Sequence, residues 1–223
     1  MPEPIVFGAA YSVYVRAVRL VLAEKGVAHR LEEVDIFSGE GPPTAYLERH
    51  PFARIPAFEH DGFRLYESGA ISRYVDEAFP GPALMPESAR GRARLNQILS
   101  ILDNYAYRTL VWDIFVERVR KPGRGEAPDE ARIQAALPKA ARCLGALAAL
   151  AGKPPFLVAG RLSLADLHAA PLFSYFLMAP EGRELMAAEP RLEAWWETVS
   201  ARPAMAATRS PLEAGEAAPI DES

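Results

Sequence analysis

The pattern of the sequence changes near Glu87, and this change limits the fold more than any other feature. Before it, strand and helix signals alternate, and after it strand signals nearly vanish. The apolar run Ile5–Phe7, closed by a glycine, predicts a buried strand. Asp61-Gly62 between two apolar runs predicts a hairpin, and Ser68 begins a helix that ends at Pro80. The predicted order of the first region is β-α-β-α-β-β-α.

The second region predicts helices only. Apolar residues keep helical spacing within a long helix expected from Glu87 to Arg120, and a second helix is expected over 131–150. Ser163 and Asp166 have the spacing of a capping box, in which each side chain satisfies a backbone amide at the start of a helix. The last expected helix lies around 192–199. The fold class is therefore an α/β domain followed by an all-α domain.

Composition and charge exclude several classes of protein. The chain has 223 residues and a net charge of −4, which gives no electrostatic footprint for nucleic acid. Its single cysteine, Cys143, rules out an internal disulfide, and the four histidines have no metal-ligand spacing. No apolar stretch is long enough to span a bilayer, and the first residues lack the basic region of a signal peptide. We expect a cytoplasmic protein with no metal, no membrane partner and no nucleic-acid partner.

Three short segments contain residues that could serve a functional site or could have a purely structural role. Ser12 follows the first strand and has the position of a helix N-cap. Glu67 and Ser68 precede a helix, where a hydroxyl and an acid favour the positive helix end. Pro56 stands at the start of a strand, where a missing amide is tolerated and a trans bond is the usual form. From the residues alone, each of these structural explanations stays open.

Four segments, in the same order, resemble the cytosolic glutathione transferases. They are Val6-Phe7-Gly8 with Ser12 and Arg16, His50–Phe58 around Pro56, Leu65–Ile71, and Ser163–Asp166. The resemblance covers about residues 4–205 and is greatest to serine-type members, phi-like and bacterial in style. It implies an α/β thioredoxin-like N-terminal domain over 1–81 and an all-α C-terminal helical domain over 87–207 that contributes to an electrophile site. The residues from 208 to 223 are acidic and lack periodicity, and we expect them to be disordered.

The resemblance also implies how glutathione is held. Ser12 would donate a hydrogen bond to the glutathione sulfur, with Tyr11 as the alternative donor. The Ile55–Pro56 bond would be cis, so that the Ile55 backbone pairs with the cysteinyl part of the peptide. Ser68 would receive the γ-glutamyl carboxylate at a helix N-terminus, and Glu67 would pair with the amino group.

The sequence departs from the family where the glycyl carboxylate of glutathione is usually met by a basic side chain. The stretch 39–43 contains neither Lys nor His, and His50 or Arg54 are the expected substitutes. Asp103 stands where many members reach across a dimer to the glutathione amine, and a solvated side chain is the alternative. The residues expected to face the electrophile are Tyr11, Tyr14, Tyr107, Trp112 and Phe115, with core packing as the alternative for the last three.

These expectations combine into one function with two rivals. We expect a glutathione transferase that activates glutathione, a co-substrate, as a thiolate for attack on a small, mostly apolar electrophile. No permanently bound cofactor is expected, and the partner is a second copy of the chain in a homodimer. One rival is a non-catalytic ligand-binding or protein-docking module of the same fold. The other is a glutathione-dependent isomerase or peroxidase.

Overall fold

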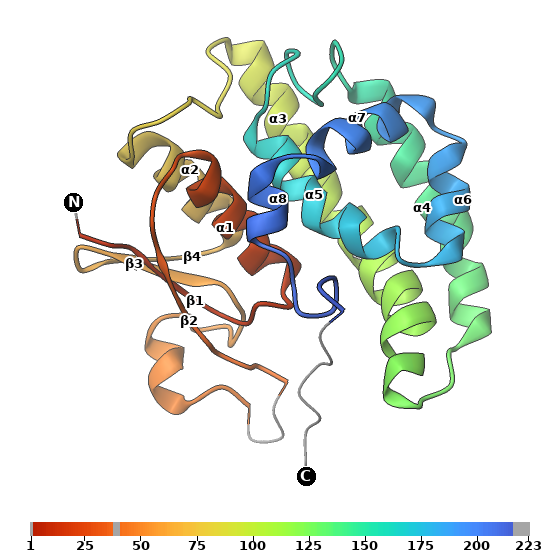
Figure 1. The fold of residues 1–223 in the computed structure, drawn as a ribbon, viewed down its shortest axis with the longest axis horizontal. Coiled ribbons are helices and arrows are strands. Elements are labelled where there is room, and N and C mark those ends of the chain that lie inside the picture. The colour runs from red at the N-terminus through yellow and green to blue at the C-terminus, as the bar shows by residue number, and fades with distance from the viewer. Residues whose placement is uncertain (1, 38–40, 216–223) are drawn as a thin grey trace. The chain divides into compact units, whose positions relative to one another are not determined.

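The computed structural model describes residues 2–37 and 41–215, which form two compact units (Figure 1). The first unit contains the residues up to Ala83 together with those from Arg202 onward. The second unit contains Leu84–Ala201. The α/β region and the helical region predicted from the sequence are therefore both present, and Arg202–Gly215 belong to the first of them.

A four-stranded mixed sheet forms the centre of the first unit, in the order β2-β1-β3-β4. The strand β1 pairs in parallel with β2, and β3 pairs antiparallel with both β1 and β4. The strands are β1 (Ile5–Phe7), β2 (Arg30–Glu32), β3 (Ala57–His60) and β4 (Phe63–Tyr66). The expected second helix is reduced to a single 3-10 segment, η1 (Thr44–Glu48).

The hairpin between β3 and β4 is the one predicted from the sequence. Asp61 and Gly62 have φ angles of 50° and 78°. Two successive residues with positive φ are typical of a type I′ turn, whose twist matches the flanking strands. This turn sets the register in which Ala57 faces Tyr66.

Three helices complete the first unit, and one of them comes from the far end of the sequence. The helix α1 (Val13–Glu24) buries an apolar face that includes Val15, Val18 and Leu22. It packs against α2 (Ser68–Ala78) and against α8 (Pro203–Ala207). In Figure 1 the blue α8 lies beside the red α1.

The second unit is entirely helical. Its first helix, α3 (Ala89–Ile101), continues without a break as η2 (Leu102–Arg120), which has π-type hydrogen bonding. The amide of Lys121, for example, donates to the carbonyl of Val116 at 2.9 Å. The other elements are η3 (Pro122–Arg124), α4 (Glu130–Leu150), α5 (Leu164–Phe176), α6 (Pro180–Ala187) and α7 (Pro190–Ser200).

Asp166 organises the second unit around the start of α5. Its carboxylate accepts hydrogen bonds from the amide and hydroxyl of Ser163, which completes the predicted capping box. It also accepts from the amide of Leu157 at 2.8 Å and from Nε1 of Trp195 at 2.9 Å. The carboxylate therefore joins the loop before α5 to α7 through four hydrogen bonds inside the core.

A buried carboxylate also joins η2 to the start of α4. Glu117 is fully buried and forms ion pairs with Arg132 at 2.9 Å and Lys121 at 2.7 Å. Burial raises the pKa of Glu117, but the hydrogen bonds from Lys121 and the Asp129 amide outweigh it, and the net pKa is lowered. The carboxylate therefore stays charged within this network.

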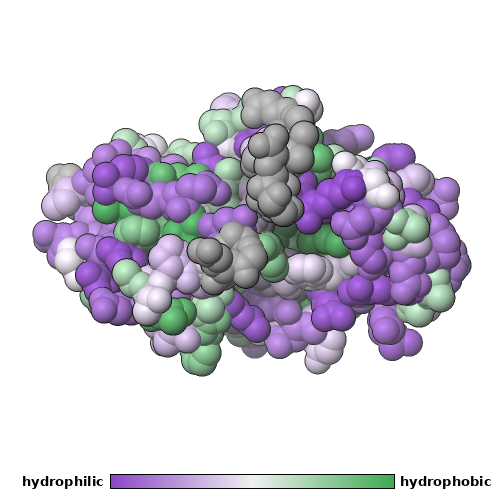
Figure 2. Space-filling model, turned by 90° about the horizontal axis from the view of Figure 1, so that it is seen from below, coloured by the Kyte–Doolittle hydropathy of each residue, from purple (hydrophilic) through white to green (hydrophobic). Residues whose placement is uncertain are grey.

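The exposed surface carries some apolar side chains, two of which, Phe52 and Tyr66, pack edge to face. The face in Figure 2 is mainly hydrophilic, with separate patches of hydrophobic residues. The large hydrophobic side chains that are exposed are Phe37, Leu47, Phe52, Phe63, Tyr66 and Tyr105. Exposure of single apolar residues is ordinary on protein surfaces. Among the described residues, no helix combines the length and apolar character that crossing a membrane requires.

The unit boundaries differ from the predicted domain limits at the end of the chain. The prediction places 203–207 in the helical domain and treats 208–223 as a disordered tail. In the structure, α8 and the residues up to Gly215 belong to the first unit, and Ser210 is buried. The rest of the predicted tail, 216–223, lies outside the described residues. The ion pairs that hold this segment join residues almost two hundred positions apart. Such contacts leave no local pattern, so the acidic composition of the segment suggested disorder.

Candidate functional site

The register of the sheet brings three predicted motifs to one edge. Phe7 pairs with Ala57, and Ala57 pairs on its other side with Tyr66. The end of β1, the start of β3 and the end of β4 therefore lie next to one another. The loops that meet this edge carry Ser12, Ile55–Pro56 and Glu67–Ser68.

Gly8 fixes the loop after β1 against Ile55. Its φ of +152° lies in the region that favours glycine, and a Cβ here would stand 2.5 Å from Cγ2 of Val15. The same Cβ would stand 3.1 Å from Cβ of Ile55. The Ile55–Pro56 peptide bond is cis, as the resemblance implies. The loop that leads to Ser12 and the loop before Pro56 are therefore in close contact.

Ser12 is the N-cap of α1, so the structural explanation from the sequence is correct as far as it goes. Its Oγ accepts a hydrogen bond from the amide of Val15, at 3.4 Å. This contact is long and uses only an oxygen lone pair, so the hydroxyl proton remains available to a further acceptor. The side chain is half-buried. A capping serine can therefore also serve as a hydrogen-bond donor at the sheet edge.

Tyr11, the alternative donor, has a different partner. Its hydroxyl donates to Oδ1 of Asp35 at 2.6 Å. The same carboxylate oxygen accepts from the amide of Phe37 at 2.9 Å, and the Tyr11 and Phe37 rings lie 6.1 Å apart. A phenol has one proton to donate, and here it is engaged by a carboxylate. The geometry therefore favours Ser12 over Tyr11 as the donor to a ligand.

Glu67 and Ser68 stand at the start of α2 in a strained conformation. Glu67 has φ 70° and ψ 112°, a region that side-chain-bearing residues rarely adopt and that is often found at functional sites. It is the N-cap, yet its side chain makes no capping hydrogen bond and is exposed. Ser68 is the first helical residue and is buried. The simple capping interaction expected from the sequence is absent here, and the helix N-terminus has an acid and a hydroxyl beside it.

His50 and Arg54 are the two expected substitutes for a missing basic residue, and they differ sharply. His50 is only 2% exposed and lies under Tyr66, with ring centroids 4.8 Å apart. Burial lowers the pKa of His50. The nearby charge of Glu67 raises this pKa and that of Arg54 lowers it, and the net shift is downward, so the ring is neutral at neutral pH. Arg54 is exposed and keeps a charged guanidinium. Arg54 is therefore the better partner for a carboxylate, while residues 38–40 of the loop before it lie outside the described residues.

Arg16 is neither on a solvated helix face nor an unmatched positive charge. It is 3% exposed, and its Nη1 contacts both carboxylate oxygens of Glu213 at 2.5 and 2.6 Å. A buried arginine needs such a partner, because an uncompensated buried charge is costly. The positive charge of Arg16 is therefore balanced within the first unit.

In the second unit the expected site residues have separate environments. Phe115 is buried and stacks on Tyr175 with ring centroids 4.4 Å apart, which matches the core-packing alternative. Tyr107 and Trp112 are half-buried on η2, as is Tyr14 on α1 in the first unit. Phe115 is thus buried, whereas these three aromatic residues are only half-buried.

Asp103 is partly exposed and has a buried partner. Its Oδ1 lies 2.8 Å from Nε2 of His168, whose side chain is 3% exposed. The solvated side chain considered from the sequence is therefore only part of its environment, since one oxygen is held by α5. Across residues 2–37 and 41–215, no three His, Cys, Asp or Glu side chains gather as a metal ion would require.

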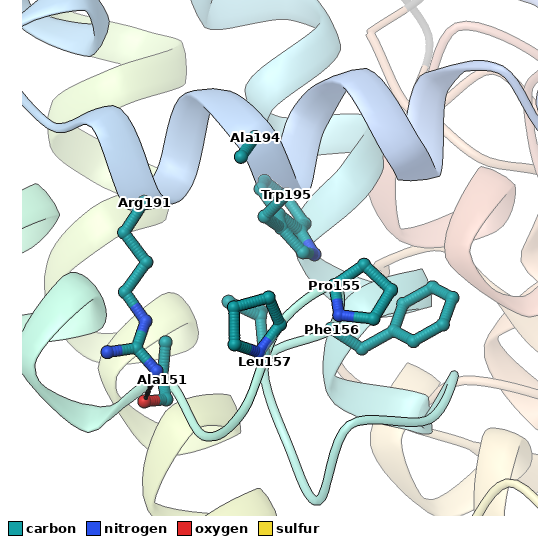
Figure 3. Close-up of a pocket in the computed structure, with 8 residues that line it drawn as sticks. Ala151, Pro155, Phe156, Leu157, Arg191, Ala194 and Trp195 are labelled. Carbon is teal, nitrogen blue, oxygen red and sulfur yellow. Dashed lines mark hydrogen bonds between the residues drawn. The ribbon is translucent and has the colours of Figure 1, made fainter.

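A small depression in the second unit has the wrong size for a substrate. Figure 3 shows Arg191 and Trp195 of α7 facing the loop that carries Pro155 and Leu157. The cavity measures about 50 Å³, whereas small-molecule sites usually measure roughly 300–1,000 Å³. The dashed line in Figure 3 joins Arg191 to the carbonyl of Ala151, at the end of α4. This cavity lies between the ends of α4 and α7 and is too small to compete with the sheet edge as a candidate site.

Two residues near the sheet edge were not predicted as site residues. Asp35 binds the Tyr11 hydroxyl and the Phe37 amide, and the Phe37 side chain is exposed. A single acid inside the apolar run Val34–Phe37 was the signal that was available. Its partner is 24 residues earlier, so spacing alone did not indicate the contact.

Comparison with known proteins gives the same result over nearly the whole chain. The family model described as "Glutathione S-transferase, N-terminal domain" matches residues 6–83, and "Glutathione S-transferase, C-terminal domain" matches 92–203. Glutathione S-transferase F9 of Arabidopsis thaliana is 31% identical over 202 residues, covering 89% of this chain and 93% of the relative. Glutathione S-transferase 3 of Zea mays is also 31% identical, covering 91% of each chain.

Solved structures agree with these sequence matches. A glutathione S-transferase III in apo form has a TM-score of 0.81 at 30% identity, covering 93% of this chain and 95% of that one. Glutathione transferase F7 from Populus trichocarpa has a TM-score of 0.80 at 31% identity, covering 92% and 97%. The matched sequence, the mixed sheet and the helical second unit lead to one conclusion: this chain belongs to the glutathione S-transferase family.

Proposed function

We propose that this chain binds glutathione at the edge of its sheet and activates the thiol through the hydroxyl of Ser12. The observation that carries the proposal is the convergence of three loops at the edge where Phe7, Ala57 and Tyr66 pair. Each loop supplies one kind of group that glutathione needs: a hydroxyl donor, an extended backbone and a helix N-terminus.

The chemistry required is stabilisation of a thiolate. A free thiol has a pKa near 8.5 and is mostly protonated at neutral pH. Lowering this pKa by about two units needs about 2.7 kcal/mol of preferential stabilisation of the anion. One hydrogen bond to a charged group contributes about 1.5–3 kcal/mol, and the N-terminus of α1 adds a favourable field. The Ser12 hydroxyl and the helix start are therefore sufficient in magnitude.

The rest of the peptide has partners at the same edge. The backbone of Ile55 would pair with the cysteinyl residue, and Ser68 at the start of α2 would receive the γ-glutamyl carboxylate. The exposed carboxylate of Glu67 would pair with the α-amino group. Arg54, which keeps its charge, would meet the glycyl carboxylate. Asp103 of a partner subunit is a further ligand of the amino group if the chain forms the homodimer we propose.

The reaction that we propose is nucleophilic substitution or addition at an apolar electrophile. The thiol proton leaves to solvent, and the thiolate sulfur forms a bond to the electrophilic carbon. In the substitution case the bond to the leaving group breaks, and that group departs with the bonding electrons. In the addition case the π bond of the electrophile breaks, and its electron pair takes up a proton from solvent. Ser12 donates a hydrogen bond throughout and forms no covalent intermediate. The proposed setting is the cytoplasm.

The test combines binding, thiol titration and turnover. The wild-type protein should bind immobilised glutathione, develop thiolate absorbance at a pH well below 8.5, and conjugate a generic aryl halide. Binding without turnover would instead support a non-catalytic ligand-binding module. Absence of binding would contradict the assignment of the glutathione site. Light scattering at micromolar concentration tests the homodimer, which a monomeric mass would contradict.

A further inference from the structure

The C-terminal strap, residues Arg202–Gly215, is fastened to α1 near both ends of that helix. Near the C-terminal end, Arg202 forms a bidentate ion pair with Glu24, at 2.5 and 2.6 Å. Near the N-terminal end, Arg16 forms an ion pair with both oxygens of Glu213. One short segment, distant in sequence, therefore contacts the helix that begins after Ser12 at both Arg16 and Glu24.

Several groups of the strap accept hydrogen bonds from the Arg16 guanidinium. Besides Glu213, it offers the carbonyl of Met205 to Nη2 at 3.1 Å and the hydroxyl of Thr208 to Nε at 3.4 Å. The Thr208 hydroxyl donates its own proton to the carbonyl of Ala204 at 2.8 Å, so its lone pair is left for the arginine. Three chemically different acceptors on the strap thus converge on one buried cation.

Glu213 is also held in place by hydrogen bonds within the strap itself. Its Oε2 accepts from the amide of Ser210 at 3.0 Å and from the Ser210 hydroxyl at 2.7 Å. The amide of Glu213 donates back to that hydroxyl at 3.3 Å. This reciprocal arrangement has the geometry of a capping box, and it orients the carboxylate toward α1.

Arg16 is joined directly to Ser12 through the backbone. Its amide donates to the carbonyl of Ser12 at 2.9 Å, which is the first hydrogen bond of α1. Within α1 the Ser12 side chain is held by a long contact, to the amide of Val15. The position of the Ser12 hydroxyl therefore depends on how firmly the first turn of α1 is held, and Arg16 is the residue that anchors this turn to the strap.

We infer that Glu213 is a positioning residue for thiol activation, acting through Arg16 to hold the first turn of α1 and with it Ser12. The inference rests on the proposed function of Ser12. The hydrogen bonds of Glu213 described above are to Arg16 and Ser210. Glu213 keeps the Ser12 hydroxyl oriented toward the sulfur. Loss of Glu213 therefore affects the stability of the thiolate more than it affects the binding of glutathione.

The direction of the effect separates positioning from simple electrostatics. Replacing Glu213 by glutamine removes a negative charge and leaves Arg16 unbalanced. By charge alone, this would lower the pKa of the bound thiol, because an added positive field favours an anion. Loss of positioning has the opposite effect, because a poorly aimed hydroxyl stabilises the thiolate less. The two explanations thus predict shifts of opposite sign.

The experiment measures thiolate absorbance of bound glutathione against pH in Glu213→Gln and in a matched control, Arg202→Gln. The control breaks the other ion pair of the same strap, far from Ser12. For Glu213→Gln we expect the thiol pKa to rise by about half to one unit, kcat below that pKa to fall roughly three- to tenfold, and KM for glutathione to change less than about twofold. For Arg202→Gln we expect a lower melting temperature and an unchanged thiol pKa.

Several outcomes would overturn the inference. An unchanged or lowered thiol pKa in Glu213→Gln, or an equal rise in both variants, would remove the positioning role. If Glu213→Gln fails to fold, Glu213→Asp decides, since it keeps the charge and retracts the carboxylate by one methylene. A rise in the pKa of the bound thiol in Glu213→Asp supports the inference, and no rise overturns it. A wild-type protein without thiolate absorbance would instead contradict the proposed function itself.

Discussion

The hydroxyl of Tyr11 donates to the carboxylate of Asp35 at 2.6 Å. This contact distinguishes Tyr11 from Ser12, the two residues that the sequence leaves open as hydrogen-bond donors to the glutathione sulfur. Ser12 is the next residue, but its hydroxyl only accepts a long contact from Val15. A proton held by a carboxylate is not available to a sulfur anion, whereas a capping serine retains its own. The roles of the two neighbours can therefore be tested independently.

Ser12→Ala should raise the pKa of the bound thiol toward its free value and leave most glutathione affinity intact. Because a hydrogen bond to a charged group is worth about 1.5–3 kcal/mol, the rate at neutral pH should fall roughly ten- to a hundredfold. Tyr11→Phe should leave the titration unchanged and alter mainly electrophile binding. Ultraviolet absorbance of the thiolate against pH measures both. A shift in Tyr11→Phe alone would reverse the assignment.

Ser68→Ala should weaken glutathione binding by roughly tenfold or more, because it removes a hydroxyl donor from a carboxylate. Ser72→Ala is the matched control, since Ser72 is also buried and stands one turn further along α2. Calorimetric titration with glutathione measures both variants. Equal affinity in Ser68→Ala and wild type would show that the γ-glutamyl carboxylate binds elsewhere.

Gly8→Ala should destabilise the first unit and impair thiol activation together. The added Cβ would stand 2.5 Å from Val15, so the loop toward Ser12 has to move. Gly62→Ala separates the two causes of instability. It also introduces a side chain at positive φ, but nothing lies within 4 Å of its Cβ. We expect it to cost about 1 kcal/mol with normal activity. Urea unfolding and turnover measure both, and similar losses in the two variants would argue against the clash.

The stability of the protein should fall as the pH drops below about 6.5, the ordinary pKa of histidine. Burial lowers the pKa of His50, so the unfolded chain takes up a proton there before the folded protein does. Acid then favours unfolding, by at most about 1.4 kcal/mol per pH unit for each such group. Above this range His50 is neutral in both states and has no effect.

His50→Gln should therefore reduce the loss of stability between pH 7.5 and pH 5.5, measured by urea unfolding at each pH. His29 has the same direction of shift, again chiefly because of burial, so His29→Gln reports its separate share. An acid sensitivity that is the same in His50→Gln and wild type would contradict this explanation.

Asp166→Asn should destabilise the second unit by about 3 kcal/mol, because an amide nitrogen cannot accept the hydrogen bonds that the carboxylate accepts. The indole of Trp195 donates to that carboxylate, so tryptophan fluorescence follows the change directly. Asp129→Asn is the control: it caps α4 at an exposed position and should cost about 1 kcal/mol or less. Similar losses in both variants would mean that the buried network adds nothing beyond a helix cap.

Local signals predicted the parts of this fold that depend on local physics. The Asp61-Gly62 turn, the capping box at Ser163 and the strand that ends just before Gly8 are each determined by residues close in sequence. The family motifs then indicated which loops meet. Contacts between distant residues, such as Arg16 with Glu213, left no local pattern. For the same reason the segment after 207 suggested disorder, although its Glu213 pairs with the buried Arg16.

The return of the chain end to α1 makes the first unit discontinuous in sequence, with Leu84–Ala201 inserted into it. During synthesis from the N-terminus, the sheet and α1 emerge early, but Arg202 and Glu213 emerge only after the whole helical unit. Until then Arg16 lacks its counter-ion, and the first unit cannot reach its final stability. Closing so long a loop slows folding more than it lowers stability. Residues made after the helical unit therefore complete a unit whose sheet was made before it.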